Sequence, residues 1–403
     1  MISCFFPMTS CYARTQAENL LNEVTPQKVN VSQDLQKGNI AMSDFAVRLA
    51  QASQKEGENL LISPLSVLYA LAMTANGAKE ETLAQMEDVL GMGIEELNHY
   101  LYSYIQTLPT NEKYKLNLAN SIWFTSDNRF SVKQEFLQKN ADYYGADIFK
   151  APFDTSTLKD INTWVKDKTD GMIPEILDEI PNDAIMYLIN ALAFEAEWES
   201  IYEKQLVRKG NFTTETGAKQ NVEFMYSEEN KYLEDENATG FIKYYKDRKY
   251  AFAALLPNEG VSVNEYLSEL SGIHLKELLA NAKNELVNAT IPKFETEYEV
   301  DMSEILIEMG MTDAFDGNKA DFTGLGTSTN GNIFINRVLH KTFISVAEHG
   351  TKAGASTVVG MVDEGAMVMP VPKIVHLDRP FVYMLIDCEN NIPLFIGTMM
   401  SVE

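Results

Sequence analysis

Cysteine is rare in this sequence, with three residues in a chain of 403. Cys4 and Cys11 lie close to the first residue, and only Cys388 belongs to the body of the chain. A disulfide framework inside the body is therefore excluded. A structural zinc site is also excluded, because no cluster of cysteine and histidine has the spacing of zinc ligands.

Basic residues are few as well: 33 lysines and arginines stand against 58 aspartates and glutamates, a formal net charge of −25. So acidic a chain repels phosphate backbones, and we expect no nucleic acid among its partners. After the first residues, no stretch approaches the roughly 20 apolar residues that a membrane-spanning helix needs.

The motifs of common catalytic sites are missing too. The sequence has no G-x-S-x-G elbow, no H-E-x-x-H motif, no P-loop and no G-x-G-x-x-G fingerprint. Ser63 is followed by Pro64 and an apolar run, which is typical of a serine that caps a buried helix rather than of a nucleophile. We therefore do not expect an enzyme, and we expect no cofactor and no metal.

The N-terminal segment allows two interpretations. Ile2 to Cys11 is short and apolar but has no basic start, and Met8 to Cys11 resembles a lipoprotein cleavage box with Cys11 as the lipidated residue. A truncated export signal would place the protein outside the cell or on its surface rather than in the cytoplasm; an unremarkable frayed terminus is the other interpretation. Residues 15–39 are polar, and we expect residues 1–39 to form a loose leader.

The rest of the chain predicts one mixed domain. Apolar residues with helical spacing predict helices over 41–54, from Ser63 to near Gly77, and over 80–90, 95–107, 162–167 and 300–309. Runs rich in β-branched and aromatic residues predict strands over 116–124, 186–194, 241–245, 250–256, 285–294, 333–346, 373–377, 381–387 and 394–400. Because no proline-, glycine- or serine-rich linker divides the chain, we expect a single α+β domain over residues 40–403.

One segment, residues 348–372, fits neither class although it lies between two predicted strands. From Thr351 to Met361 every odd-numbered residue is small or apolar, and the only charge, Lys352, is at an even position. A period of two with one uncharged face is what a strand needs to lie between neighbours over a packed core. The pattern therefore predicts a loop that can become a strand.

At this segment the sequence resembles the serpin family, because Glu348 to Thr357 reads E-H-G-T-K-A-G-A-S-T, like the hinge of an inhibitory serpin. His349 departs from the pattern, since a longer charged residue is usual there. Further short motifs follow in family order from about Phe45 to Glu403: N-L-L-I-S-P-L-S from Asn59, N-S-I-W-F from Asn120, I-N-T-W-V from Ile161, Asn190 with Trp198, I-P-K-F from Ile291, G-M-T-D-A-F from Gly310, His340–Lys341, Arg379–Phe381 and Pro393–Gly397.

The resemblance implies a fold of three β-sheets and eight or nine helices, held in a metastable state with an exposed reactive-centre loop over about 348–372. A serine protease cuts this loop and forms an acyl-enzyme, and the loop then inserts into the main sheet as a new strand, so that the protease is trapped in a covalent 1:1 complex. We expect a monomer. No heparin-type cofactor is expected, because the helix over 95–107 has no basic cluster.

The resemblance also assigns roles to residues. The hinge comprises Glu348, Gly350, Thr351, Ala353, Gly354, Ala355, Ser356 and Thr357. Ser63, Asn190 and His340 match the family's shutter, the polar cluster beneath the sheet where two strands part; they can equally be satisfied buried polar residues.

The position of the reactive bond follows from two counts that disagree. Counting forward from Glu348 gives Glu364–Gly365, and counting back from Pro380 gives Met369–Pro370; we prefer the first because extra residues would leave slack between hinge and bond. Ala366, Met367 and Val368 are alternates.

No lysine or arginine lies between Lys352 and Lys373, so we expect an elastase-like or subtilisin-like target, with a Glu-specific protease second. A non-inhibitory binding or chaperone protein of the same family is the alternative function; the small hinge residues favour inhibition.

Overall fold

The computed structural model describes residues 17–402, except residues 33, 110–112, 128–129, 182–183, 330 and 352–370. Within this part of the chain there are nine α-helices: α1 (Gln36–Ser53), α2 (Pro64–Ala75), α3 (Glu80–Leu90), α4 (Ile94–Thr107), α5 (Gln134–Tyr143), α6 (Thr155–Lys168), α7 (Val263–Glu269), α8 (Gly272–Ala280) and α9 (Ser303–Glu308). Short 3-10 turns lie at η1 (Lys204–Leu206), η2 (Lys246–Arg248) and η3 (Asp313–Phe315).

Three large sheets and one small ribbon organise the strands. The seven-stranded sheet has the order β1 (Glu18–Asn19), β5 (Asp147–Ala151), β3 (Tyr114–Thr125), β6 (Met186–Glu197), β16 (Gly350–Thr351), β15 (Arg337–Ala347) and β13 (Phe294–Asp301). The six-stranded sheet runs β2 (Leu60–Ile62), β19 (Ile392–Met399), β18 (Phe381–Asp387), β11 (Tyr250–Pro257), β10 (Ala238–Tyr244) and β9 (Tyr232–Glu234). The four-stranded sheet runs β17 (Lys373–His376), β12 (Val287–Pro292), β8 (Lys219–Glu229) and β7 (Val207–Thr213), and β14 (Gly326–Ser328) pairs with β4 (Phe130–Val132).

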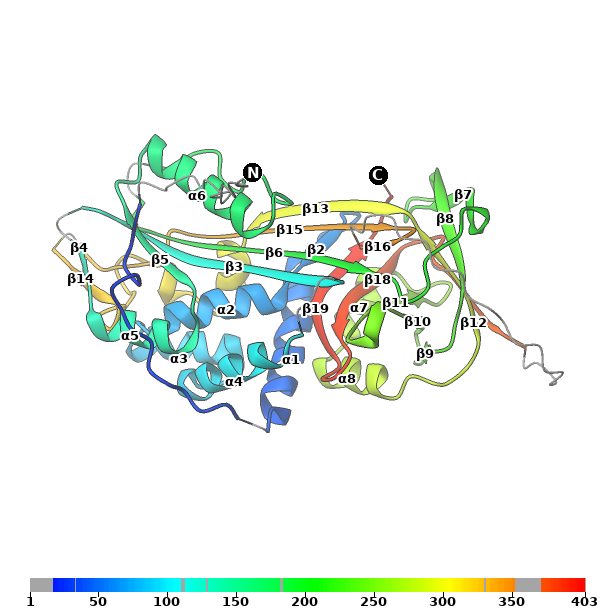
Figure 1. The fold of residues 1–403 in the computed structure, drawn as a ribbon, viewed down its shortest axis with the longest axis horizontal. Helices are drawn as coiled ribbons and strands as arrows, with labels where there is room; N and C mark the ends of the chain where they lie inside the picture. Colours follow the sequence, from blue (N-terminus) through cyan, green and yellow to red (C-terminus); the bar gives the residue numbers. More distant parts are fainter. Residues whose placement is uncertain are drawn as a thin grey trace, which may run out of the picture.

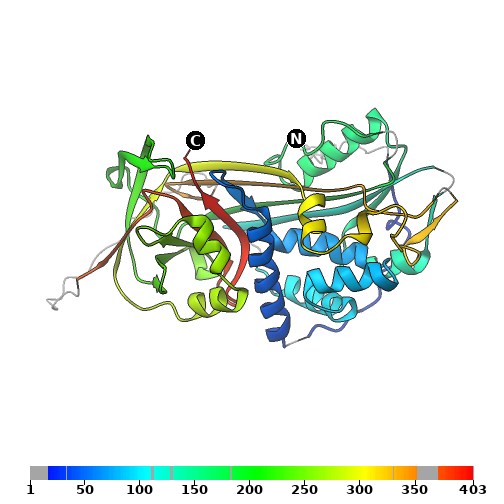
Figure 2. The same ribbon diagram turned by 180° about the vertical axis from the view of Figure 1, so that it is seen from behind.

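The seven-stranded sheet spans the molecule between two layers of helices (Figure 1). Helices α2 to α4 lie against one face and α6 lies over the opposite face, while the other two large sheets, with α7 and α8, form the other end of the molecule (Figures 1 and 2). This mixed arrangement confirms the predicted α+β fold.

Helix α2 is the centre of the larger core, and all twelve of its residues are buried. Pro64 occupies its first turn, where the missing N–H costs nothing, and the hydroxyl of Ser63 accepts the Ser66 N–H at 3.2 Å. The helix therefore begins where the sequence predicts, and its first residue stands directly beneath the seven-stranded sheet.

A second, smaller core lies between α6 and the outer face of the same sheet. Trp164 of α6 packs edge-on against Trp123 of β3, with ring centroids 6.5 Å apart, and Ile161, Val165 and Tyr187 are buried in the same cluster. Both faces of the central strands are therefore covered, which explains why β6 is buried over most of its length and reads as a continuous apolar run.

Three predicted elements differ from the structure. The strand predicted over 285–294 is two strands, β12 and β13, which belong to different sheets and are separated by Lys293. The helix predicted over 300–309 begins only at Ser303, because Val300 and Asp301 still pair with β15. The strand predicted from residue 333 begins at Arg337. The residue pattern from which these elements were predicted does not change at the boundaries, so it does not show where an element begins or divides.

The expectation of a loose leader is wrong for the described part of that segment. Glu18 and Asn19 pair with Lys150 and Phe149 of β5, and Val24 is buried in the larger core. The Ser32 N–H donates to the Ser103 hydroxyl of α4 at 2.8 Å. The sequence did not indicate this, because the partners of the segment lie far away in the chain and leave no local pattern in it. Residues 1–16, with the predicted Cys11 lipidation, lie outside the described residues.

Candidate functional site

The end of β15 carries the described part of the hinge, Glu348 to Thr351. Here the chain turns back and places β16 between β6 and β15: Gly350 and Thr351 pair with Glu197 and Ala196 on one side and with Ala347 and Val346 on the other. The first two residues of a strand thus already lie within the sheet. Gly350 has a φ of 151°, and a Cβ there would lie 1.9 Å from the Ala196 carbonyl oxygen, so the position requires glycine.

Thr351 is fully buried, and its hydroxyl is 2.6 Å from the hydroxyl of Tyr245. Tyr245 is itself buried, and its ring stacks on Trp198 with centroids 4.3 Å apart. An inward-facing Thr351 is the orientation that the alternation of the sequence predicts. The other hinge residues, Ala353, Gly354, Ala355, Ser356 and Thr357, lie outside the described residues, as do Glu364, Gly365, Ala366, Met367 and Val368 of the predicted reactive bond.

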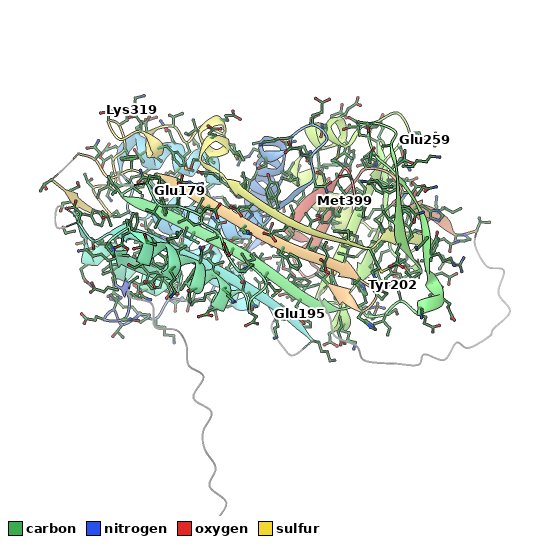
Figure 3. All side chains as sticks on the ribbon, turned by 90° about the horizontal axis from the view of Figure 1, so that it is seen from above. Glu179, Glu195, Tyr202, Glu259, Lys319 and Met399 are labelled. Atoms are coloured by element: carbon green, nitrogen blue, oxygen red, sulfur yellow. The ribbon has the colours of Figure 1, made fainter. Side chains whose placement is uncertain are left out.

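The backbone just before β16 is held by the segment that follows β6. The Trp198 N–H donates to the His349 carbonyl at 3.0 Å, and the Tyr202 N–H donates to the Glu348 carbonyl at 2.9 Å. The Trp198 indole N–H also donates to the Ala347 carbonyl at 2.8 Å. Figure 3 shows Tyr202 at this end of the sheet, far along the strands from Glu179. The hinge therefore rests against an aromatic wall, formed by Trp198, Tyr202 and Tyr245.

An ion pair holds the side chain of Glu348. The Lys293 ammonium donates to its carboxylate at 2.9 Å, from the corner between β12 and β13, and also lies 3.4 Å from Glu223. Burial alone would raise the pKa of Glu348, but the Lys293 hydrogen bond, a backbone hydrogen bond and the Lys293 charge together hold the pKa below its usual value. Glu348 is therefore ionised at neutral pH, which couples the hinge to the four-stranded sheet.

Below the hinge, β6 and β15 pair directly and in parallel, from Tyr187 opposite Arg337 to Ala193 opposite Phe343. We call this boundary the seam. Because parallel strands are not joined to each other by a hairpin, β6 and β15 can separate without breaking one. The seam is continuous with the space that β16 already occupies.

The shutter cluster, Ser63, Asn190 and His340, comes together under the middle of the seam. The Ser63 N–H donates to His340 Nε2 at 3.1 Å, so the neutral imidazole carries its proton on Nδ1 and donates it to Asn190 Oδ1. The Asn190 amide donates to the Leu339 carbonyl at 2.9 Å. All three predicted residues are buried, and the cluster joins α2, β6 and β15.

Two residues that lie in the quoted family motifs, but to which the sequence assigned no role, extend this cluster. The Ser66 hydroxyl donates to Asn120 Oδ1 at 3.2 Å, and Asn120, on β3, lies opposite Asn190 of β6.

Burial lowers the pKa of His340 to about 3, because charging an imidazole without water is costly. His340 is therefore neutral at physiological pH and acts as a hydrogen-bonding group rather than as a cation.

Trp198, Tyr202, Tyr245 and Lys293 form the rest of the site. Trp198 and Lys293 lie in family motifs, but only the structure gives them contacts to the hinge. Nothing in the sequence around Tyr202 or Tyr245 indicates a site, because neither residue is near residue 350 in the chain and no periodicity links them.

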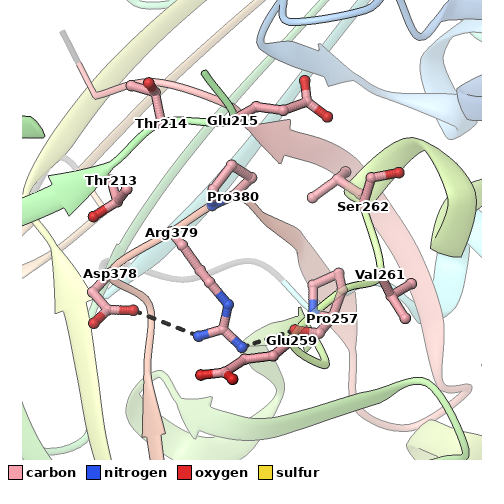
Figure 4. A pocket seen from close by; sticks show the side chains of 11 residues that line it. Thr213, Thr214, Glu215, Pro257, Glu259, Val261, Ser262, Asp378, Arg379 and Pro380 are labelled. Carbon is pink, nitrogen blue, oxygen red and sulfur yellow. Dashed lines mark hydrogen bonds and ion pairs between the residues drawn. The ribbon is translucent and has the colours of Figure 1, made fainter. Parts of the chain in front are cut away.

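A cavity of about 410 Å³ lies elsewhere, between the β7–β8 turn, the β11–α7 loop and Asp378 to Pro380 (Figure 4). Its Arg379 guanidinium donates to the Pro257 carbonyl at 2.9 Å and lies 3.6 Å from Asp378. Both contacts are internal, so this arginine ties two loops together. Among the described residues no three His, Cys, Asp or Glu side chains could jointly hold a metal ion, and no helix in that part of the chain could cross a membrane.

Comparison with known proteins agrees with this geometry. The sequence model described as "Serpin (serine protease inhibitor)" matches residues 40–402. The solved native-state structure of tengpin, a thermophilic serpin, is 52% identical, with a TM-score of 0.92 over 96% of this chain and all of tengpin. Its latent-state structure, 50% identical over 94% of this chain, has a TM-score of 0.81, so the arrangement described here is closer to the native state.

More distant relatives are similar over most of their length. An uncharacterised serpin-like protein of Thermococcus kodakarensis is 28% identical over 90% of this chain and 85% of its own. Human thyroxine-binding globulin, solved with its ligand, is 22% identical with a TM-score of 0.81 over 91% of this chain and 99% of its own, which shows the fold alone.

Proposed function

The chain belongs to the serpin family, whose members are described as serine protease inhibitors, and from that premise we propose that it traps serine proteases by a single covalent turnover. The observation that carries this proposal is β16: two hinge residues already lie between β6 and β15, with Thr351 fully buried. A loop that enters the sheet at this point has the direct continuation of the seam in front of it.

The proposed reaction begins as ordinary proteolysis. The hydroxyl oxygen of the protease serine attacks a backbone carbonyl carbon in the loop, the C–N bond breaks, and the amine leaves on the C-terminal fragment with a proton from the protease histidine. The N-terminal fragment remains as an ester on the protease. Insertion of that fragment into the seam then moves the bound protease away before water can hydrolyse the ester.

The energy for this movement comes from the new strand. A strand with about a dozen ladder hydrogen bonds, at about 1 kcal/mol net each, contributes on the order of 10 kcal/mol before side-chain packing. That is comparable to the whole stability of a typical domain. In the uncleaved chain both ends of the loop are attached to strands, β15 and β17, that lie in different sheets, and this attachment opposes insertion.

The target is proposed from the composition of the loop alone. Residues 353–372 contain no lysine or arginine, so a trypsin-like pocket has no side chain to bind there. Val362, Ala366, Met367 and Val368 suit the shallow apolar pockets of elastase-like or subtilisin-like proteases. We place the cleaved bond at Glu364–Gly365, with the bonds around Met367 as alternates.

A protease panel tests this proposal. The chain is incubated with an elastase, a subtilisin, trypsin and a Glu-specific protease, and the products are separated on a denaturing gel after boiling. We expect a complex of the summed masses with the elastase or the subtilisin, and none when the protease serine is replaced by alanine.

Mass spectrometry of the released C-terminal peptide identifies the bond. Cleavage by every protease without any boiling-resistant complex would contradict inhibition and support the non-inhibitory binding or chaperone function. Efficient trapping of trypsin at a bond outside 362–369 would contradict the assignment of the target.

A further inference from the structure

Lys243 of β10 is a buried cation that the mechanism above does not use. Its side chain is 2% exposed, and its Nζ donates to Glu229 Oε1 at 2.8 Å; Glu229 is itself 13% exposed. The Ser227 hydroxyl donates to the same carboxylate oxygen at 2.7 Å and is 3.3 Å from the Tyr202 hydroxyl. Two charges removed from water are costly unless they are paired and hydrogen-bonded, and this pair is both.

The ammonium holds two aromatic rings. Lys243 Nζ lies 4.4 Å from the ring centroid of Tyr202 and 5.4 Å from that of Trp198. A cation over an aromatic face is attracted by the ring quadrupole, and more strongly where water is absent. Desolvation lowers the pKa of Lys243, but Tyr202 and Glu229 raise it by more, so the pKa lies above its usual value and the group is charged.

Both rings belong to the wall that holds the hinge. The Trp198 and Tyr202 backbone N–H groups donate to the His349 and Glu348 carbonyls, and Trp198 stacks on the ring whose hydroxyl contacts Thr351. Every contact between Lys243 and the hinge therefore passes through the aromatic wall. Register matters here, because a slip of one residue would turn Thr351 from the core face to the outer face.

We propose that Lys243, held by Glu229, is a positioning residue that fixes the aromatic wall and thereby sets the register in which the hinge enters the seam. Its effect on inhibition rests on the proposed function above. Its effect on the wall does not, and can be measured without any protease.

The test compares three variants with the wild-type chain. Lys243→Met with Glu229→Gln removes both charges and keeps the volumes, so no unpaired charge is left buried. Lys243→Arg keeps a cation over the rings. The matched control is Lys283→Met with Glu234→Gln, since Lys283 also pairs with a carboxylate, at 2.5 Å, and lies 5.9 Å from the Tyr232 ring, but is about half exposed and away from the hinge.

Hydrogen exchange of the amides of Trp198 and Tyr202 is the direct readout. In the Lys243→Met, Glu229→Gln variant we expect at least tenfold faster exchange at these two amides and unchanged exchange in the seam between β6 and β15. In Lys243→Arg and in the Lys283 control we expect the same exchange rates as in the wild-type chain. The stoichiometry of inhibition should rise several-fold in the same variant, because a misplaced hinge inserts late and more loop is lost as substrate.

Unchanged exchange at Trp198 and Tyr202 would overturn the proposal, as would equal acceleration throughout the sheet, which is a general loss of stability. Lys243→Arg behaving like the charge-free variant would also overturn it. If the double variant does not fold, Lys243→Gln with Glu229→Gln, which also leaves no buried charge and keeps a polar pair, is measured against the same criteria. If the wild-type chain traps no protease, the proposed function fails while the exchange measurement still decides the role of Lys243.

Discussion

The two ends of the boundary between β6 and β15 are held in different ways. At the hinge end the strands are already apart, with Gly350 and Thr351 paired between them, and the aromatic wall and Lys293 add contacts from outside the two strands. In the middle the strands pair directly, and the shutter cluster ties them to each other and to α2. The two strands are therefore already separated at the hinge end and still paired with each other in the middle.

This difference between the hinge end and the middle suggests that insertion would start at one place and meet its free-energy barrier at another. An inserted strand would replace the direct ladder between β6 and β15 with two new ladders, so the backbone hydrogen bonds lost at the seam are regained. For a strand to insert, the hydrogen bonds of His340 to Asn190 and to Ser63 would have to break while β6 and β15 separate. Their loss would therefore add to the free-energy barrier of insertion. Contacts at the hinge should therefore decide where insertion begins, and contacts in the shutter cluster should decide how readily it proceeds.

The largest expected effect comes from cutting the loop, which removes the difference between the two ends. Cleavage between residues 362 and 369 should let the strand continue through the seam and stabilise the fold by on the order of 10 kcal/mol. For a chain of this size the melting temperature should rise by roughly 10–20 °C. Calorimetry before and after cleavage measures this rise, and equal melting temperatures would contradict loop insertion.

Thr351→Arg should have the next largest effect, because it acts where insertion begins. The Thr351 side chain is fully buried, and a guanidinium there would cost several kcal/mol. The uncleaved chain can relieve this cost by withdrawing two residues, but the inserted strand cannot, so we expect a substrate instead of an inhibitor.

The yield of boiling-resistant complex should fall by about tenfold or more, since 1.4 kcal/mol already corresponds to a factor of ten. The control is Thr329→Arg, at an exposed threonine far along the chain from the hinge. A stoichiometric complex with Thr351→Arg would show that the inward assignment is wrong.

Acid should weaken the middle of the boundary through His340. Its pKa in the folded chain is about 3 against an ordinary 6.5, so below pH 6.5 the unfolded chain binds a proton that the folded chain does not. Stability should fall by up to about 1.4 kcal/mol per pH unit from pH 6.5 towards 3, which is about 2–3 kcal/mol at pH 4.5.

Denaturant unfolding at several pH values measures this slope in the wild-type chain and in His340→Gln, which should lose it. His99→Gln is the control, because His99 is an exposed histidine that contacts only the α4–α5 surface through Tyr143. The same slope in His340→Gln and in the wild-type chain would exclude His340 as its source.

The smallest effect is expected at the ion pair of the hinge. The Glu348 and Lys293 side chains are about 30% exposed, 29% and 32% respectively, so solvent screens the pair, and Glu348→Gln should cost about 0.5–1 kcal/mol. A double-mutant cycle with Lys293→Met isolates the interaction. A coupling energy well above about 1 kcal/mol would mean that the hinge is locked as firmly as the shutter cluster, and the contrast between the two regions would disappear.

Much of this architecture could be predicted from the chain. The Ser63–Pro64 start of α2, the long apolar strands and the α+β class followed from periodicity and caps, because those signals are local. The shutter cluster was predicted only through the family resemblance. Ser63, Asn190 and His340 are widely separated in the chain, and no local pattern brings them together.

Other features could not be predicted for physical reasons. The division of 285–294 into β12 and β13 at Lys293 depends on which neighbours each part finds, since β12 pairs with β8 and β13 pairs with β15. The docking of residues 17–32 combines backbone pairing with β5 and side-chain contacts to β5 and α4, and these partners lie far away in the chain. Nothing in the sequence around Lys243 indicates that its side chain is buried.

The sequence by itself determined the loop: its uncharged alternating face, its lack of basic residues and its glycine at position 350 are local properties that no packing can alter. Only the tertiary structure decided what surrounds the loop. The aromatic wall, the buried Lys243–Glu229 pair and the shutter cluster join side chains that are far apart in the chain, because burial, unlike periodicity, is set by the chain as a whole.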